Sequence, residues 1–112
     1  MGEAISYVGT KTPREEGPLL FDFTDKLGDE EIQSIEDVTA WEISDNGDET
    51  EVTADVIDSL QESFSGKKAY PWIKGGTHGK MYLVAVKVKS SPGGAIYEGF
   101  ARFRVIDPRE LV

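Results

Sequence analysis

The sequence contains no cysteine among its 112 residues. This absence excludes a disulfide framework, cysteine-ligated zinc, iron–sulfur clusters and thiol catalysis. Histidine occurs once, at His78 in a glycine-rich stretch where solvent exposure is expected, and nothing specifies a nucleophile, a base and an orienting acid together. No apolar run approaches the roughly 18 residues that cross a bilayer, and the start lacks the basic-then-apolar order of a signal peptide. We therefore expect a soluble, non-exported protein that is not an enzyme and has no cofactor or membrane partner.

Length and composition indicate one folded domain. At 38% apolar and 10% aromatic residues, the chain can bury roughly 65% of its unfolded surface without outside help. Residues 1–18 are rich in glycine and proline and poor in apolar side chains, so we expect a flexible or extended N-terminal arm there. The domain is expected over residues 19–107, followed by a short C-terminal tail over 108–112.

The two halves of the chain differ sharply in charge. The net charge is −9, but residues 1–65 carry 18 acidic and 3 basic side chains, whereas residues 66–112 carry 3 acidic and 9 basic ones. Such asymmetry indicates either two opposed charged faces or strands from both halves that mix their charges in space. The overall negative charge disfavours a nucleic-acid partner.

Hydrophobic alternation predicts short strands along the chain. Val84 and Val86 share one face with Phe103 and Val105 across an expected antiparallel hairpin. Pro71 places its strand at an edge or bulge. Residues 55–64 fit a helix and a strand equally well. The segments expected as strands are 20–24, 34–44, 50–54, 68–73, 82–89 and 96–106.

Turn residues support the same architecture. Asn46-Gly47 is a strong hairpin signal, because a type I′ turn needs positive φ at both central residues. About seven short strands with turn signals every 8–12 residues are typical of an immunoglobulin-like antiparallel β-sandwich. Tyr82 follows a tight glycine loop, where such sandwiches place a tyrosine whose hydroxyl bonds back to the preceding loop, although an ordinary core tyrosine fits as well.

Acidic and aromatic residues offer alternative binding chemistry. Residues 45–49 superficially resemble a cation loop but lack the EF-hand spacing, so solvated carboxylates are the simpler interpretation and calcium stays open. Trp41 alternates in step with Ile43, so we expect it to point into the core. The alternative is that Trp41, Trp72 and Tyr70 form an exposed platform for sugars. A second calcium candidate consists of Asp22, Asp25, Asp29 and Glu30.

Several motifs resemble a known family, the bacteriophage fiber-tail adaptor proteins, which are small Ig-like virion components. The resemblance runs from about Lys11 to Val105. Its best stretch is Trp-Ile-Lys-Gly-Gly-Thr-His-Gly over residues 72–79, which is similar to the family's Trp-Leu-x-Gly-Gly-Thr-x-Gly segment. The other matching features are Lys11-Thr12-Pro13, Phe21-Asp22-Phe23-Thr24, the Leu-Gly-Asp turn over 27–32, Trp41 and Tyr82.

The resemblance implies a non-enzymatic structural protein of a tailed phage virion. It would link the tail to receptor-binding fibres and contact other virion proteins, namely the tail tube or an adaptor and the tail fibre. Several copies in a symmetric assembly, formed in the host cytoplasm, are implied. A soluble adhesion or carbohydrate-binding Ig-like module is the alternative, which secretion would favour.

Charge asymmetry supplies the candidate contact residues. We expect them to be rim charges that steer association between copies or with a charged partner. The residues expected to matter for structure are Trp41, Trp72, Gly75, Gly76 and Tyr82. The basic candidates are Lys67, Lys68, Lys74, Lys80, Lys87 and Arg102, and the acidic ones are Asp45, Asp48, Glu49 and Glu51.

Overall fold

Alternating polar and apolar side chains place most of the chain in β-structure. The computed structural model describes residues 8–111, and strands predominate within them, which confirms the all-β class. Each helix has only four residues. The elements are β1 (Val8–Lys11), β2 (Gly17–Pro18), β3 (Phe21–Asp22), α1 (Thr24–Leu27), β4 (Glu31–Ile43), β5 (Glu49–Glu51), α2 (Thr53–Val56), β6 (Ser63–Ser65), β7 (Lys68–Tyr70), β8 (Trp72–Ile73), β9 (Met81–Ser91), β10 (Ile96–Val105) and the 3-10 helix η1 (Pro108–Leu111).

The longest strands form a five-stranded sheet in the order β1-β10-β9-β4-β5. β9 and β10 pair antiparallel from Ile96 opposite Lys89 to Arg104 opposite Met81, which confirms the expected hairpin. Alternation along β9 gives the sheet one apolar face, because Val84, Val86 and Val88 are fully buried while Lys87 is exposed. Ala85 interrupts the pattern, since it points to the other face and is also buried.

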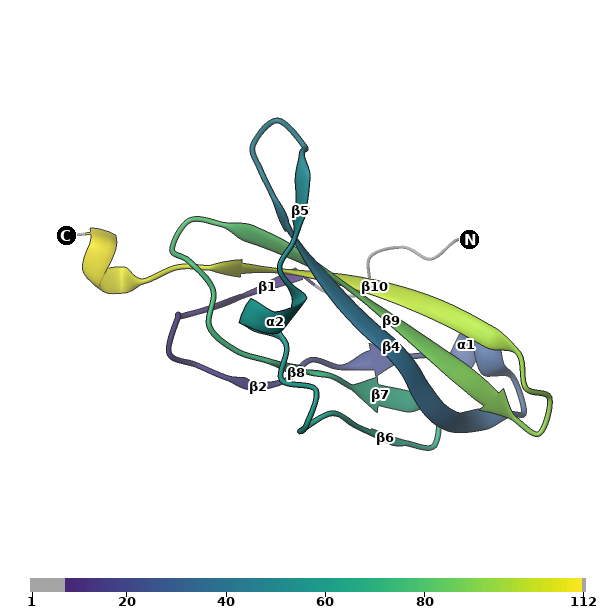
Figure 1. Ribbon diagram of the computed structural model, residues 1–112. Coiled ribbons are helices and arrows are strands. Elements are labelled where there is room, and N and C mark those ends of the chain that lie inside the picture. The colour runs from purple at the N-terminus through teal and green to yellow at the C-terminus, as the bar shows by residue number, and fades with distance from the viewer. Residues whose placement is uncertain (1–7, 112) are drawn as a thin grey trace.

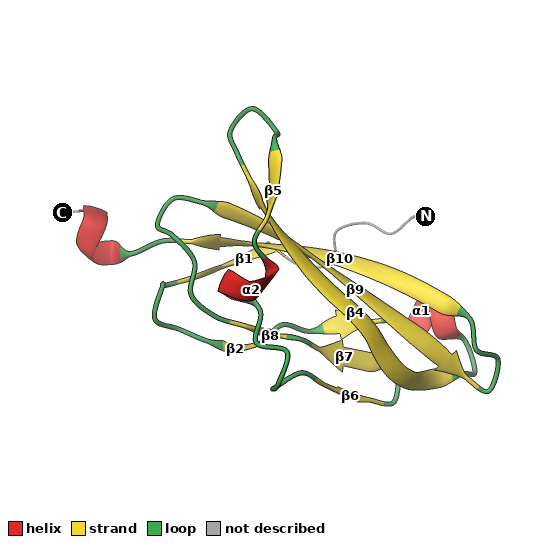
Figure 2. Ribbon diagram, in the orientation of Figure 1, coloured by secondary structure: helices red, strands yellow, loops and turns green. Residues whose placement is uncertain are grey.

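A second layer of short strands covers the apolar face of the sheet. It consists of a two-stranded sheet, β2-β8, and a three-stranded sheet, β3-β7-β6, which lie below β9 and β10 in Figures 1 and 2. Pro71 is buried at the break between β7 and β8, in keeping with the irregularity expected at that residue. Ten strands are therefore described where about seven were expected, because several are only two or three residues long.

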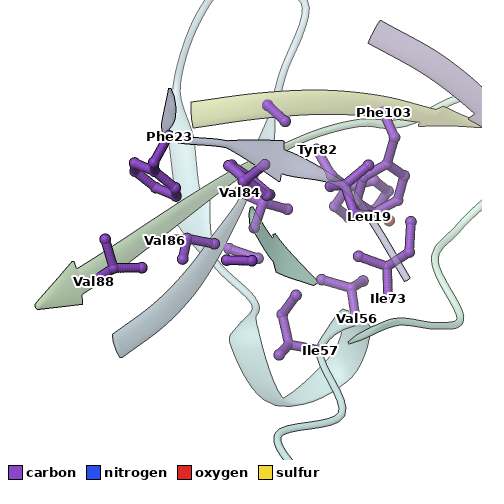
Figure 3. Packing of buried hydrophobic residues seen from close by; sticks show 14 of the residues in the cluster. Leu19, Phe23, Val56, Ile57, Ile73, Tyr82, Val84, Val86, Val88 and Phe103 are labelled. Carbon is purple, nitrogen blue, oxygen red and sulfur yellow. The ribbon is translucent and has the colours of Figure 1, made fainter. Parts of the chain in front are cut away.

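The hydrophobic core fills the space between the two layers. Phe21 and Phe23 belong to the same buried cluster as Val84, Val86 and Phe103 of the sheet. Figure 3 shows Phe23 and Phe103 toward opposite ends of this cluster. Each of these side chains contributes about 1.5–3 kcal/mol by leaving water. Gly99 allows the close approach of Phe23, since a Cβ there would lie 3.1 Å from its ring.

Two irregularities in β4 change which side chains face the core. The pairing of β4 with β9 slips before Ser34 and again before Asp37. Each slip moves the following side chains to the other face. The two slips cancel for residues before the first one, but the second slip alone separates Ile35 from Trp41. Ala40 is therefore fully buried, whereas Trp41 and Ile43 are only partly covered and lie outside the core cluster. The prediction that Trp41 points into the core is therefore wrong.

The β4–β5 hairpin is confirmed, but its turn type is not. Trp41 pairs with Glu51 across the hairpin, which projects from the body of the molecule in Figure 1. Gly47 has a φ of +92°, and no described non-glycine residue has a positive φ, so Asn46 does not satisfy a type I′ turn. The Gly47 N–H instead donates to the Ser44 carbonyl over 2.9 Å, which closes a longer loop.

The ambiguous segment 55–64 contains both kinds of structure. The helical turn α2 ends at Val56, Ile57 bridges to Ile73, and the chain becomes strand again at β6. Val56 and Ile57 are buried, but Leu60 is 93% exposed, so the i, i+4 spacing does not mark one continuous apolar face.

The expected N-terminal arm is not free over residues 8–18. β1 pairs parallel with β10, with Lys11 opposite Val105, and β2 pairs with β8. Backbone hydrogen bonds thus attach a segment of low apolar content, a contribution that hydropathy does not reveal. Residues 1–7 lie outside the described part of the chain, and the division of the chain at residue 18 stays a prediction.

Candidate interaction surfaces

The acidic candidates gather on one projecting element. Asp45, Asp48, Glu49 and Glu51 all lie on the β4–β5 hairpin and are exposed. The N–H of Asp48 donates to the Ser44 hydroxyl over 3.0 Å, which helps to hold the loop. The fold therefore presents these carboxylates together, as a charged hairpin that a partner can approach from several sides.

The basic candidates are spread over the molecule. Lys67 and Lys68 lie at the β6–β7 turn, Lys74 follows β8, and Lys80 precedes β9. Lys67 donates its Nζ hydrogen to the Gly28 carbonyl. These side chains do not form one continuous basic face.

The fold also mixes charges from the two halves. Lys80 forms an ion pair with Glu42 at 3.5 Å. Lys87 on β9 lies between Asp37 on β4 and Glu98 on β10 in the sheet register. The sequence allowed either two opposed charged faces or strands from both halves that mix their charges. In the structure the charges are largely mixed, and the acidic β4–β5 hairpin is the main exception.

The outer face of the five-stranded sheet carries a band of half-exposed apolar side chains. Trp41 pairs with Leu83 and Ile43 pairs with Met81 between β4 and β9. All four are partly exposed. Arg102 pairs with Leu83 from the β10 side. This band was not predicted from the sequence. Its signal is nevertheless present there, since Met81 and Leu83, on the other face of β9 from the core valines, are also apolar.

An acidic groove lies beside β4. Its volume is about 720 Å³, and Val38, Val52 and Ile57 are among its apolar lining residues. Burial raises the pKa of Glu62, and the neighbouring carboxylate of Asp37 raises it further. The carboxylates that line it are Glu36, Asp37, Glu51, Asp55 and Glu62.

The calcium candidates do not come together as a metal site. Within residues 8–111, no group of three or more histidine, cysteine, aspartate or glutamate side chains is placed to hold a metal ion. The carboxylate of Asp22 instead accepts hydrogen bonds from the N–H and hydroxyl of Thr24. These hydrogen bonds lower the pKa of Asp22, and this local role accounts for the side chain.

The glycine loop before β9 is fixed by Tyr82. The Tyr82 hydroxyl accepts a hydrogen bond from the Thr77 N–H at 2.9 Å, as predicted, while its ring stacks on Phe103 with a centroid separation of 5.2 Å. Gly76 has a φ of +97°, and a Cβ there would lie 2.5 Å from Cγ2 of Val105. Only glycine fits this close approach of the loop to the core.

His78 has a structural role in the same loop. Its Nδ1 accepts a hydrogen bond from the Asp107 N–H at 2.9 Å, and the side chain is half-buried rather than fully exposed as expected. Arg109 donates two side-chain hydrogen bonds to the Asp107 carboxylate and lowers its pKa to about 2. These contacts join the C-terminal segment to the loop.

Lys11 is a buried cation that the sequence analysis overlooked. It is 8% exposed, and its Nζ donates hydrogen bonds to the carbonyls of Thr12 and Gly75. Burial lowers the pKa of Lys11, and the carboxylates of Glu15 and Glu16 partly offset this effect. Lys11 thereby connects β1 to the glycine loop.

The aromatic residues considered as a sugar platform lie in different layers. Trp41 is on the outer face of the five-stranded sheet, whereas Tyr70 and Trp72 alternate with buried residues of the second layer. The indole N–H of Trp72 donates to the carboxylate of Glu16 over 2.9 Å. The fold therefore does not bring the two tryptophans together.

The fold and these surfaces define a small all-β protein with an exposed acidic hairpin and a partly apolar outer sheet face. No helix within residues 8–111 is long and apolar enough to span a membrane. Residues 11–100 match the family described as podophage GP4 fiber-tail adaptor protein gp77, and the chain belongs to this family. No curated protein matches the chain. Membership indicates a structural, fiber-tail adaptor role as a component of a phage virion.

Proposed function

We propose that this protein is a non-enzymatic part of a phage tail that links the tail to receptor-binding fibres through protein–protein contacts. The family match over residues 11–100 is the observation that carries the proposal. Its partners are the tail tube or an adaptor on one side and the tail fibre on the other. Several copies assemble symmetrically in the host cytoplasm before the virion is released.

Exposed hydrophobic residues support a protein-binding role. Of the four large hydrophobic side chains that are most exposed in the described chain, three belong to the second layer or its connections. Leu20 is 47% exposed, Leu60 93% and Phe64 40%. Contact with another protein would remove this apolar surface from water, which is favourable. We assign them to the fibre or tail contact.

The two-layer arrangement supports an immunoglobulin-like sandwich as the finer description of the fold. The layers enclose one core, and Tyr82 bonds back to the preceding loop as a tyrosine corner does. A fold of this kind suits an adaptor, because a rigid core leaves both outer faces and the connecting loops for partners.

Electron microscopy of phage particles tests the proposed function. Particles made without this protein should contain tails that lack fibres, and adding back the wild-type chain should restore them. The double substitution Leu20→Ser with Leu60→Ser should restore fewer fibres. Ile96→Ser is the matched control, since Ile96 is 51% exposed but lies on β10, and it should restore fibres fully. Fibres in normal number on particles without the protein would refute the proposal.

A further inference from the structure

The outer face of the five-stranded sheet has no cover from the part of the chain that the structure describes. The second layer packs on the opposite face, and α2 lies below β4 on the core side (Figure 1). At the end of this face where β4 ends and β9 begins, two apolar rows lie next to each other, Trp41 beside Leu83 and Ile43 beside Met81. All four side chains are partly exposed. The next row on the same face consists of Thr39, Ala85 and Phe100, of which Ala85 is buried, and the row after it is charged.

Opposite charges flank these rows on the two sides. On the β5 side, Glu51 pairs with Trp41 and Glu49 pairs with Ile43. On the β10 side, Arg102 pairs with Leu83 and Arg104 pairs with Met81. Directly paired residues point to the same face of a sheet, so each row runs from a carboxylate through two apolar side chains to a guanidinium.

The flanking charges have little compensation within the chain. All four are exposed, and none of them takes part in an ion pair in the described part of the chain. The Glu51 carboxylate accepts a hydrogen bond from the Thr53 hydroxyl at 3.0 Å, which leaves its charge without a cationic partner. The Arg104 guanidinium donates only a long hydrogen bond, 3.4 Å, to the Gly79 carbonyl. These charges are therefore available to a partner.

The order of charges makes the face complementary to itself. Consider a two-fold axis that lies above the outer face, parallel to the strands and over the gap between β4 and β9. This axis places a second copy of the sheet over the first, with β5 of one copy above β10 of the other. Glu51 then faces Arg102 of the other copy, Glu49 faces Arg104, and the apolar rows meet at the centre. Sheets packed face to face lie about 10 Å apart with nearly aligned strands, which such an axis allows.

We infer that two copies of this protein associate face to face through the outer surface of the five-stranded sheet. The partner on this face is a second copy of the chain, because a two-fold contact needs a surface that complements itself. Both charged rows of this face meet that condition. An apolar centre with a charged rim is the usual anatomy of a protein interface. The inference goes beyond the proposed link between tail and fibre and does not depend on it.

The mass of the purified full-length chain in solution tests the inference. Analytical ultracentrifugation should give twice the mass of one 12.3 kDa chain, with no larger species as concentration rises, because a two-fold contact closes on itself. The double variants Glu49→Lys/Glu51→Lys and Arg102→Glu/Arg104→Glu should each be monomeric, with dissociation constants raised at least about tenfold by like-charge repulsion.

Mixing the two variants gives the sharpest result. One variant then has basic residues on both sides of its apolar rows, and the other has acidic residues on both sides. Each repels its own kind and attracts the other, so the mixture should form a one-to-one dimer. Lys67→Glu with Lys68→Glu, at the β6–β7 turn, is the matched control and should remain as dimeric as the wild type.

Three outcomes would overturn the inference. The first is a monomeric wild type, which would leave this face to a different protein. The second is an assembly that grows beyond two copies, and the third is a dimer that neither charge reversal affects. Circular dichroism of each variant establishes that it is folded, which surface charge changes should permit. Fibre attachment is measured separately on particles, so a failure here is distinguishable from a failure of the proposed function.

Discussion

The two faces of the five-stranded sheet differ although they share the same strands. On the inner face, Val84 and Val86 of β9 are fully buried beside Phe103 of β10. On the outer face, Leu83 and Met81 are partly exposed and lie among charged residues. The same period-2 alternation thus produces a core on one side and a partly exposed surface on the other. Apolar side chains at alternate positions stabilise the domain only where a second layer excludes water.

The largest effect should come from emptying the inner face. Phe103→Ala should lower the free energy of unfolding by about 3–5 kcal/mol, because it removes a fully buried ring that stacks on Tyr82. That is a large part of a total of about 5–15 kcal/mol. Leu83→Ala, on the outer face, is the comparison and should cost clearly less. Urea denaturation measures both, and equal losses would contradict the assignment of the two faces.

A smaller loss of stability should follow from adding a side chain to the glycine loop where it packs against the core. Gly76→Ala combines a strained positive φ with a Cβ placed 2.5 Å from Val105, and should cost about 2–3 kcal/mol. Gly79→Ala has a φ of +84° but nothing within 4 Å of its Cβ, so it should cost only the strain of about 1–2 kcal/mol. Thermal melts compare the pair, and a Gly79 variant as unstable as the Gly76 variant would refute the contact.

Removing the Tyr82 hydroxyl should lower the free energy of unfolding by a smaller amount than the glycine substitutions. Tyr82→Phe keeps the ring against Phe103 but leaves the Thr77 N–H without its acceptor, which should cost about 1 kcal/mol. Hydrogen exchange at the Thr77 amide should also become faster. An unchanged exchange rate would show that this hydrogen bond does not hold the loop.

The smallest expected effect concerns pH and the C-terminal segment. Arg109 holds the pKa of Asp107 at about 2, below its ordinary value of 3.8, so the carboxylate stabilises the fold above pH 4. This contribution should be lost as pH falls from about 4 towards 2. Asp107→Asn should reduce that dependence, measured as the unfolding midpoint against pH. An identical pH profile for wild type and variant would contradict it.

The hairpin of β9 and β10 was predictable because its pattern is local and regular. Each strand has ten or eleven residues, and Val84, Val86, Phe103 and Val105 are buried as expected. The second layer was harder to predict, since strands of two or three residues are too short for a reliable period. The slip between Ile35 and Asp37 in β4 reversed the orientation that Trp41 was expected to share with Ile35, and a bulge of this kind leaves no clear mark in composition.

The sequence by itself determined the all-β class, the family, the β4–β5 and β9–β10 hairpins, and the use of Tyr82 to fix its loop. These features follow from side-chain alternation, turn residues and short motifs, which act over a few neighbouring residues. Tertiary structure decided which apolar residues became core and which became surface. It also paired β1 with β10, buried Lys11 and aligned Glu51, Trp41, Leu83 and Arg102 in one row. Such placements depend on contacts between residues distant in the chain, and their register is set only when the strands pair.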